Sequence, residues 1–271
     1  MSNVFFNKDH WKVPKVVETQ NIEEDIEAFL GRDVFDKWKT LRVGDELREK
    51  IIVITERLEF IGHLRKIAEI AKENTTEIGT IAKDGVNIIP DKCNLFGHNF
   101  DGLRFDIEAL NFYLYLTCID TIQNKGKWHT RTFKKAFTSD IEADLKTKIS
   151  EVFVVIKIGN GEKTMSLTDK KQLEKLNEML EDWKAKKEAK RLREIADTLY
   201  DIRSRFTHDN IRSFCPIDEM SVIPYFKPNK KGILLWDKNY ASSNNIKSID
   251  EVLGDVIKEL CLKKLNMKLG K

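Results

Sequence analysis

The segment from Leu103 to Gln123 constrains the fold most, because it is apolar around almost its whole helical circumference. A helix of this kind has no polar face to turn toward water, so other elements must surround it. The chain can supply them, since apolar residues recur at spacings of three and four over several other long stretches. We therefore predict a mainly α protein in which this segment is a central, buried helix.

The same spacing predicts helices over five other stretches. They are 21–41 with a break at Gly31, 45–73, 128–150, 169–207 and 249–266. Asn21, and Ser248 or Asp250, are suitable N-caps for the first and last of these, because short polar side chains accept hydrogen bonds from the free N–H groups of a first turn. The predicted helices are thus numerous and long enough to form a helical bundle.

The apolar stripe of the helix predicted over 169–207 thins between Trp183 and Leu192, and six basic residues crowd between Lys184 and Arg193. The helix is either long and partly unsupported in that span, or it breaks there. A second basic cluster lies at the start of the helix predicted over 128–150. Such runs more often mark a solvated face than a contact with phosphates.

Two stretches interrupt the helical pattern and predict small β-hairpins. Residues 153–158 are β-branched and apolar, a Gly-Asn-Gly turn follows, and 163–167 alternates. The apolar runs 221–225 and 232–236 predict a second hairpin or, alternatively, an ordered loop. Residues 240–247 read as a polar loop.

Composition limits the class of protein. The 271 residues are 41% hydrophobic and 34% charged, which is typical of a folded, rather charged protein. The net charge of +3 does not by itself indicate nucleic-acid binding. No apolar run approaches the roughly 18 residues of a membrane span, and the first residues lack the apolar core of a signal peptide, so no association with a membrane is expected.

The four cysteines are far apart in sequence, and the histidines do not flank them at zinc-site spacing. We therefore expect free thiols, a reducing cytoplasmic location and neither a metal ion nor a cofactor.

The stretch from Leu199 to Arg212 is the candidate site, because it sets Arg203 and His208 five residues apart at the end of the long helical pattern. On a straight helix these two positions differ by roughly 140°, from about 100° per residue. Two arrangements bring the side chains together: the helix ends between them, or two copies of the stretch face each other across a two-fold dimer.

An arginine beside a histidine suits cleavage of a phosphodiester. An imidazole can take the proton from a ribose 2′-hydroxyl or give one to the leaving oxygen, and a guanidinium can stabilise the phosphate. This chemistry requires no metal ion. The alternative is structural: Arg203 complements the dipole at the helix C-terminus, and His208 is an ordinary turn residue.

The run Leu199-Tyr200-Asp201-Ile202-Arg203-Ser204, followed by His208, resembles the signature of HEPN domains, and most closely their Apea-like branch. The resemblance implies a helical bundle that is usually dimeric. Many HEPN proteins are metal-independent ribonucleases of defence or toxin systems, and others bind only nucleotides or RNA. The Apea-like pattern usually has glycine after the histidine, where this chain has Asp209.

By this resemblance, Arg203 and His208 are the paired catalytic residues and Ser204 assists them. Four further residues are predicted to contact the substrate at the rim of the site: Arg205, Asp209, Asn210 and Arg212. The predicted function is RNA cleavage by a homodimer, with a partner protein or antitoxin as a further partner. The alternative is a non-catalytic HEPN module that binds nucleotide, RNA or a partner protein.

The predicted organisation has two parts. A helical N-terminal region covers residues 1–90, and a HEPN-like helical bundle with the two small hairpins covers residues 95–271. The glycine-containing stretch 74–90 is the candidate boundary between them.

Overall fold

The structure is a computed structural model of the chain. It describes residues 21–73, 77–79, 90–92, 100–123, 130–158, 170–208, 215–217, 220–227, 230–236, 238–246 and 248–270. Most of these residues are helical, so the mainly α fold predicted from the sequence is confirmed.

Ten helices lie within the described residues. The first five are α1 (Ile22–Leu30), α2 (Arg32–Lys39), α3 (Glu46–Glu73), α4 (Phe100–Gln123) and α5 (Thr130–Thr138). The other five are α6 (Ala143–Val152), α7 (Lys170–Lys184), α8 (Glu188–His208), α9 (Lys238–Ser243) and α10 (Ile249–Leu269).

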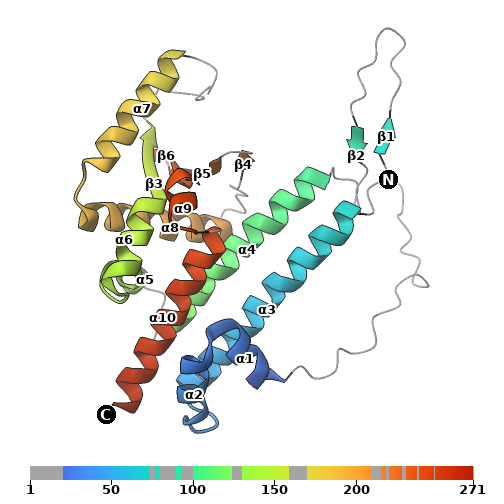
Figure 1. Ribbon diagram of the computed structural model, residues 1–271, viewed down its shortest axis with the longest axis vertical. Helices are drawn as coiled ribbons and strands as arrows, with labels where there is room; N and C mark the ends of the chain where they lie inside the picture. Colours follow the sequence, from blue (N-terminus) through green and yellow to red (C-terminus); the bar gives the residue numbers. More distant parts are fainter. Residues whose placement is uncertain are drawn as a thin grey trace.

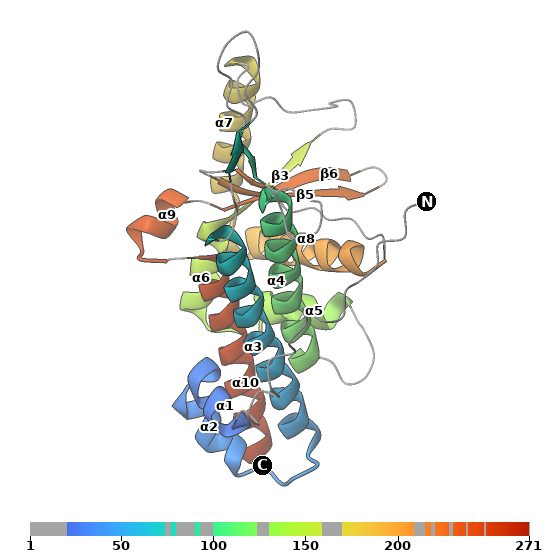
Figure 2. The ribbon, with the colours of Figure 1, turned by 90° about the vertical axis from the view of Figure 1, so that its right-hand side faces the viewer.

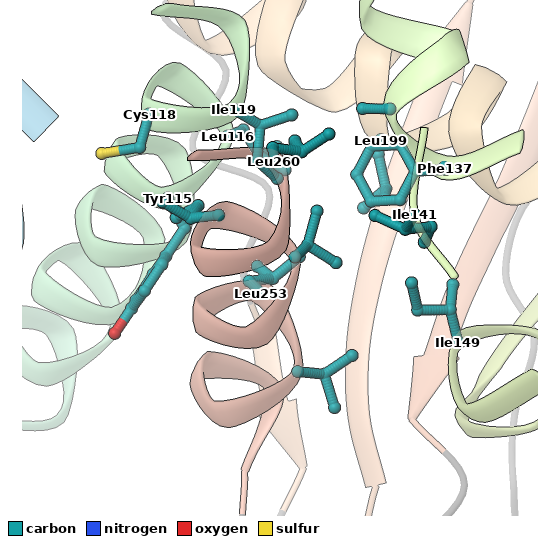
Figure 3. Close-up of a cluster of buried hydrophobic side chains, with 14 of the residues drawn as sticks. Tyr115, Leu116, Cys118, Ile119, Phe137, Ile141, Ile149, Leu199, Leu253 and Leu260 are labelled. Carbon is teal, nitrogen blue, oxygen red and sulfur yellow. The ribbon is translucent and has the colours of Figure 1, made fainter. Parts of the chain in front are cut away.

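Three long helices, α3, α4 and α10, lie side by side and form the centre of the molecule (Figures 1 and 2). Leu116 and Ile119 of α4 are fully buried, as the apolar circumference of this segment predicts. Leu253 and Leu260 of α10 lie between α4 and the side chains of α5, α6 and α8 (Figure 3). The core is therefore built around α4 and α10, which come from distant parts of the sequence.

The pair α1–α2 packs against one end of this bundle. The predicted cap is confirmed, because the Asn21 side chain accepts a hydrogen bond from the Glu23 N–H at 3.3 Å. The predicted break at Gly31 is also confirmed: its φ of 86° and ψ of 165° lie in a region that is open essentially to glycine alone. This residue turns the chain so that both short helices reach the core.

The single helix predicted over 128–150 is wrong, because the structure has two helices, α5 and α6, separated at 139–142. The Asp140 carboxylate accepts hydrogen bonds from Gln123 at 2.9 Å and from Lys263 at 3.2 Å, and the Glu142 N–H donates to the Glu259 carboxylate. Ile141 between them is buried, so the apolar spacing continues across the turn. Contacts with α4 and α10 thus determine where the helix breaks, and the spacing of apolar residues alone does not show this break.

Of the two readings of 169–207, the broken helix is the one observed, with α7 ending at Lys184 and α8 beginning at Glu188. Trp183 is buried beside the junction, and the Lys186 ammonium lies 4.8 Å from the centre of its ring. Lys186 also forms an ion pair with Glu194 at 3.1 Å. The junction is therefore anchored by packing despite its basic sequence.

The strands form two sheets. The short strands β1 (Glu77–Gly79) and β2 (Pro90–Lys92) pair antiparallel. The larger sheet has the order β3-β6-β5-β4, from β3 (Phe153–Ile158), β4 (Cys215–Ile217), β5 (Met220–Lys227) and β6 (Lys230–Trp236).

The second predicted hairpin is confirmed as β5–β6, and the first predicted strand is confirmed as β3. The two are not separate units, because β3 pairs antiparallel with β6, Phe153 opposite Trp236. The return strand predicted at 163–167 lies outside the described residues. One side of α8 packs against this sheet, so the sheet helps to hold α8 in place.

One buried cluster joins residues of the two predicted regions, for example Ile51 of α3 and Leu116 of α4. The stretch 74–90 that was predicted as a boundary lies largely outside the described residues. The division into 1–90 and 95–271 therefore stays a prediction.

The polar loop predicted over 240–247 is wrong in its first part, since the short helix α9 ends only at Ser243. Ala241 and Ile246 are buried and attach this segment to the core. The polar residues that surround them in the chain gave no indication of this burial. None of the helices described here is both long enough and apolar enough to cross a membrane.

Candidate functional site

The candidate site lies at the C-terminal end of α8. Leu192, Ile195, Ala196, Leu199 and Ile202 are buried and form the inner side of this helix. They pack against α4, α5, α6 and β3, which fixes the helix at several places along its length. Any side chain on the inner side of α8 is therefore inside the protein.

Arg203 lies on this inner side and is only 5% exposed. Its Nη2 atom is 2.8 Å from Oδ2 of Asp120 on α4, whose side chain is 2% exposed. The charge of the guanidinium is thus compensated by a buried carboxylate. Such a pair must be retained as a pair, because either partner alone would be an uncompensated charge in a low-dielectric interior.

Ser204 follows Arg203 and is partly exposed, so its position on α8 is open to solvent. His208 is the last residue of α8. Arg205 also belongs to α8, while Asp209, Asn210 and Arg212 lie outside the described residues. Of the predicted site residues, the structure therefore locates the side chains of Arg203 and Ser204 and the helical positions of Arg205 and His208.

The helix does not end between Arg203 and His208, since α8 runs from Glu188 to His208. The two positions accordingly differ by about 140° around the helix axis. The first arrangement that would bring the two side chains together within one chain is therefore absent. The second, in which two copies of the chain face each other, stays a prediction.

Sequence reasoning missed Asp120. Its signal was present, because an aspartate within an otherwise apolar helix is rarely buried without a partner. The spacing of residues along the sequence cannot pair that carboxylate with an arginine 83 positions later (203 minus 120). The contact depends on how α4 and α8 cross.

A second buried arginine lies on α8. Arg191 is 8% exposed and its Nη2 donates hydrogen bonds to the Glu151 carboxylate and, at 3.4 Å, to the Ser150 hydroxyl, both on α6. Helix α8 is thus pinned to α6 near its beginning and to α4 near its end by two arginine–carboxylate pairs.

Two cysteines, Cys118 of α4 and Cys261 of α10, are free thiols buried in the core. Burial raises the pKa of the Cys118 thiol to about 12, and burial likewise raises the pKa of Cys261. Neither is therefore a nucleophile near neutral pH. Within the described ranges, no three His, Cys, Asp or Glu side chains are grouped so as to hold a metal ion.

Two clefts lined by described residues, of about 370 and 480 Å³, lie along α10, and Glu259 and Leu262 border both. Burial raises the pKa of the Glu259 carboxyl, while the hydrogen bond that it accepts from the Glu142 N–H lowers this pKa by a smaller amount. Neither cleft includes a residue of α8. They do not coincide with the candidate site.

Comparison of the chain with protein-family models, with curated proteins and with solved structures gave no match. The resemblance to HEPN domains consequently rests on the residues of the motif in α8.

Proposed function

We propose that this chain is a metal-independent RNA endonuclease that acts as a homodimer in a defence or toxin-like system. The proposal is supported by the motif on α8, where Asp120 holds Arg203 in place and His208 ends the same helix. Because the two positions differ by about 140° around the axis, the site requires Arg203 of one copy to face His208 of a second copy. A cytoplasmic location and a partner protein or antitoxin belong to the same proposal.

In this mechanism His208 transfers the proton. It takes the proton of the ribose 2′-hydroxyl as that oxygen attacks the adjacent phosphorus. The bond from phosphorus to the 5′-oxygen breaks, a 2′,3′-cyclic phosphate forms, and the leaving 5′-oxygen takes a proton from water. Arg203 stabilises the charge that develops on the phosphate oxygens, and Ser204 lies beside it on the exposed part of the helix. Because Arg203 is 5% exposed, it reaches the substrate only through the small open part of its surface, so His208 carries the larger share of the chemistry.

The second candidate function is a binding module without catalysis, and one observation favours it. The Arg203–Asp120 pair is buried on both sides, which neutralises and shelters the guanidinium that a phosphate would need. Under this reading Arg203 holds α8 against α4, and RNA, a nucleotide or a partner protein binds elsewhere on the bundle.

A cleavage assay in EDTA separates the two functions. Fragments from a mixed RNA, lost in His208→Ala protein, are the result expected of the endonuclease. RNA that is retained but stays intact with the wild-type protein indicates the binding module. Undiminished cleavage by His208→Ala protein removes the proposed mechanism.

The role of Arg203 needs a different variant, because Arg203→Ala leaves Asp120 buried without its partner and disturbs folding. The double variant Asp120→Leu/Arg203→Met removes both charges together and preserves the packing volume approximately. We expect it to fold and to cleave RNA at most weakly. Arg191→Met is the matched control: it removes a buried arginine from the same helix and should keep cleavage per folded molecule.

A further inference from the structure

Helix α5 and the first turns of α8 carry several exposed cations. Helix α5 packs against α8 (Figure 1). The rings of Phe133 and Tyr200 are 5.7 Å apart, and an ion pair between Lys134 and Asp197 joins the solvent sides of the two helices. Five exposed cations of α5, of the first turns of α8 and of the residue before α8 are called the basic strip: Arg131, Lys135, Lys187, Lys190 and Arg193.

The carboxylates near the basic strip are largely occupied. Glu194 is paired with Lys186 at 3.1 Å and Asp197 with Lys134. No ion pair within 4.0 Å joins a cation of the strip to any carboxylate in the part of the chain that the structure describes. Elsewhere, exposed lysines are commonly paired, as Lys39 is with Glu23. The strip therefore presents uncompensated charge to solvent.

The basic strip also has a direction. Lys190 and His208 are about five helical turns apart, so their positions lie on the same side of α8, about 27 Å from each other. Arg193 lies one turn before Asp197 on this side, and Arg131 lies one turn before Lys134 on α5. On α8 the strip ends at Arg193, about 22 Å before His208, and Asp197 and Asp201 lie on the same side between them. In this part of α8 the positive charge comes from the neighbouring α5, where Lys134 pairs with Asp197 and Arg131 lies one turn away.

We propose that the basic strip binds the sugar–phosphate backbone of single-stranded RNA and leads it along α8 to His208. That the RNA is led to His208 rests on the proposed function. That the strip binds a polyanion rests on its uncompensated positive charge. Spaced cations on a rigid helix bind successive phosphates and release their counterions, whereas they do not read bases, so the contact is independent of sequence.

The test uses a 2′-O-methylated single-stranded RNA, which lacks the 2′-hydroxyl needed for cleavage, so that binding is measured apart from catalysis. The variant Lys187→Gln/Lys190→Gln/Arg193→Gln should weaken binding about tenfold or more. The slope of log affinity against log salt should fall by about 2, from about 0.7 for each lost phosphate contact on a single strand. All three side chains are exposed, so stability should change little.

The matched control is Lys66→Gln/Lys146→Gln/Lys258→Gln, which removes the same charge from α3, α6 and α10. It should leave affinity within about twofold and the salt slope unchanged, since net charge alone acts weakly at a distance beyond the Debye length. Equal losses in both triple variants, or no loss in the strip variant, would overturn the proposal. So would a wild-type protein that binds anionic vesicles in place of RNA.

Failure of this proposal is distinguishable from failure of the endonuclease. Cleavage of unmodified RNA by the wild-type protein, together with unchanged binding in the strip variant, retains the enzyme and rejects the strip. Strip-dependent binding without any cleavage retains the strip and rejects the enzyme.

Discussion

Arg191 and Arg203 lie on the inner side of the same helix, and each contacts a carboxylate from another helix, yet their surroundings differ. The Glu151 side chain beside Arg191 is 32% exposed, whereas the Asp120 side chain beside Arg203 is 2% exposed. Water therefore reaches the first pair and is excluded from the second. Removing either arginine removes one arginine–carboxylate pair, but the loss in the free energy of unfolding should differ. Water can solvate the Glu151 carboxylate in place, whereas it cannot reach the Asp120 carboxylate.

This difference also separates structure from function. Both arginines hold α8 in place, but Arg203 alone is followed by a histidine at the end of the helix. Arg191 consequently serves as an internal control: effects common to both arginines belong to folding, and effects specific to Arg203 belong to the candidate site.

The largest expected effect is that of Arg203→Met on stability. It removes the cation that lies 2.8 Å from the buried Asp120 carboxylate, so we expect the free energy of unfolding to fall by about 3–5 kcal/mol. Urea unfolding followed by circular dichroism measures it. The double variant Asp120→Leu/Arg203→Met should recover most of this loss. A single variant as stable as the wild type would mean that the pair is not buried in solution.

The next effect concerns Cys118, which lies on α4 close to Asp120. Its pKa of about 12 and its burial protect it from alkylation near neutral pH, so labelling reports opening of the core. In Arg203→Met protein we expect labelling of Cys118 to accelerate about a hundredfold or more, since every 1.4 kcal/mol is about tenfold. Peptide mass spectrometry distinguishes it from the other cysteines. Equal rates in the variant and the wild type would refute the coupling of this pair to the core.

Arg191→Met should have a smaller effect. It removes charge-assisted hydrogen bonds but leaves Glu151 in contact with water, so a loss of about 1–3 kcal/mol is expected in the same urea experiment. A loss as large as that of Arg203→Met would show that exposure of the carboxylate does not govern the cost, which is the basis of the comparison.

Lys134→Ala should have the smallest effect. Its ion pair with Asp197 lies at the surface, with the two side chains 37% and 53% exposed. Such pairs contribute about 0–1 kcal/mol, and salt screens them. The difference between this variant and the wild type should shrink further at high salt. A loss above that range would show that this surface ion pair contributes as much to stability as the pairs of Arg191 and Arg203.

The sequence was sufficient for the features that depend on local patterns. The spacing of apolar residues predicted the main helices. Asn21 predicted the N-cap of the first helix, and Gly31 predicted the break at its end. The apolar runs that became β5 and β6 were also recognised. These features follow from neighbours in sequence, which periodicity and capping chemistry describe.

Features that depend on contacts between distant residues could not be derived in this way. The break between α5 and α6 arises because Asp140 and Glu142 bond to residues of α4 and α10. The pairing of β3 with β6 requires the whole of α7 and α8 to be folded back between them. Asp120 belongs to the same group, since its partner is a residue of another helix.

The topology of the larger sheet has a consequence during synthesis on the ribosome. The apolar strand β3 emerges well before β6, the strand with which it pairs, and α7 and α8 are made in between. Until β6 is translated, the Phe-Val-Val-Ile stretch of β3 lacks that partner and is prone to pair with the same stretch of another nascent chain. A polypeptide interrupted before Lys230 should therefore aggregate, whereas one that extends past Trp236 can close the sheet.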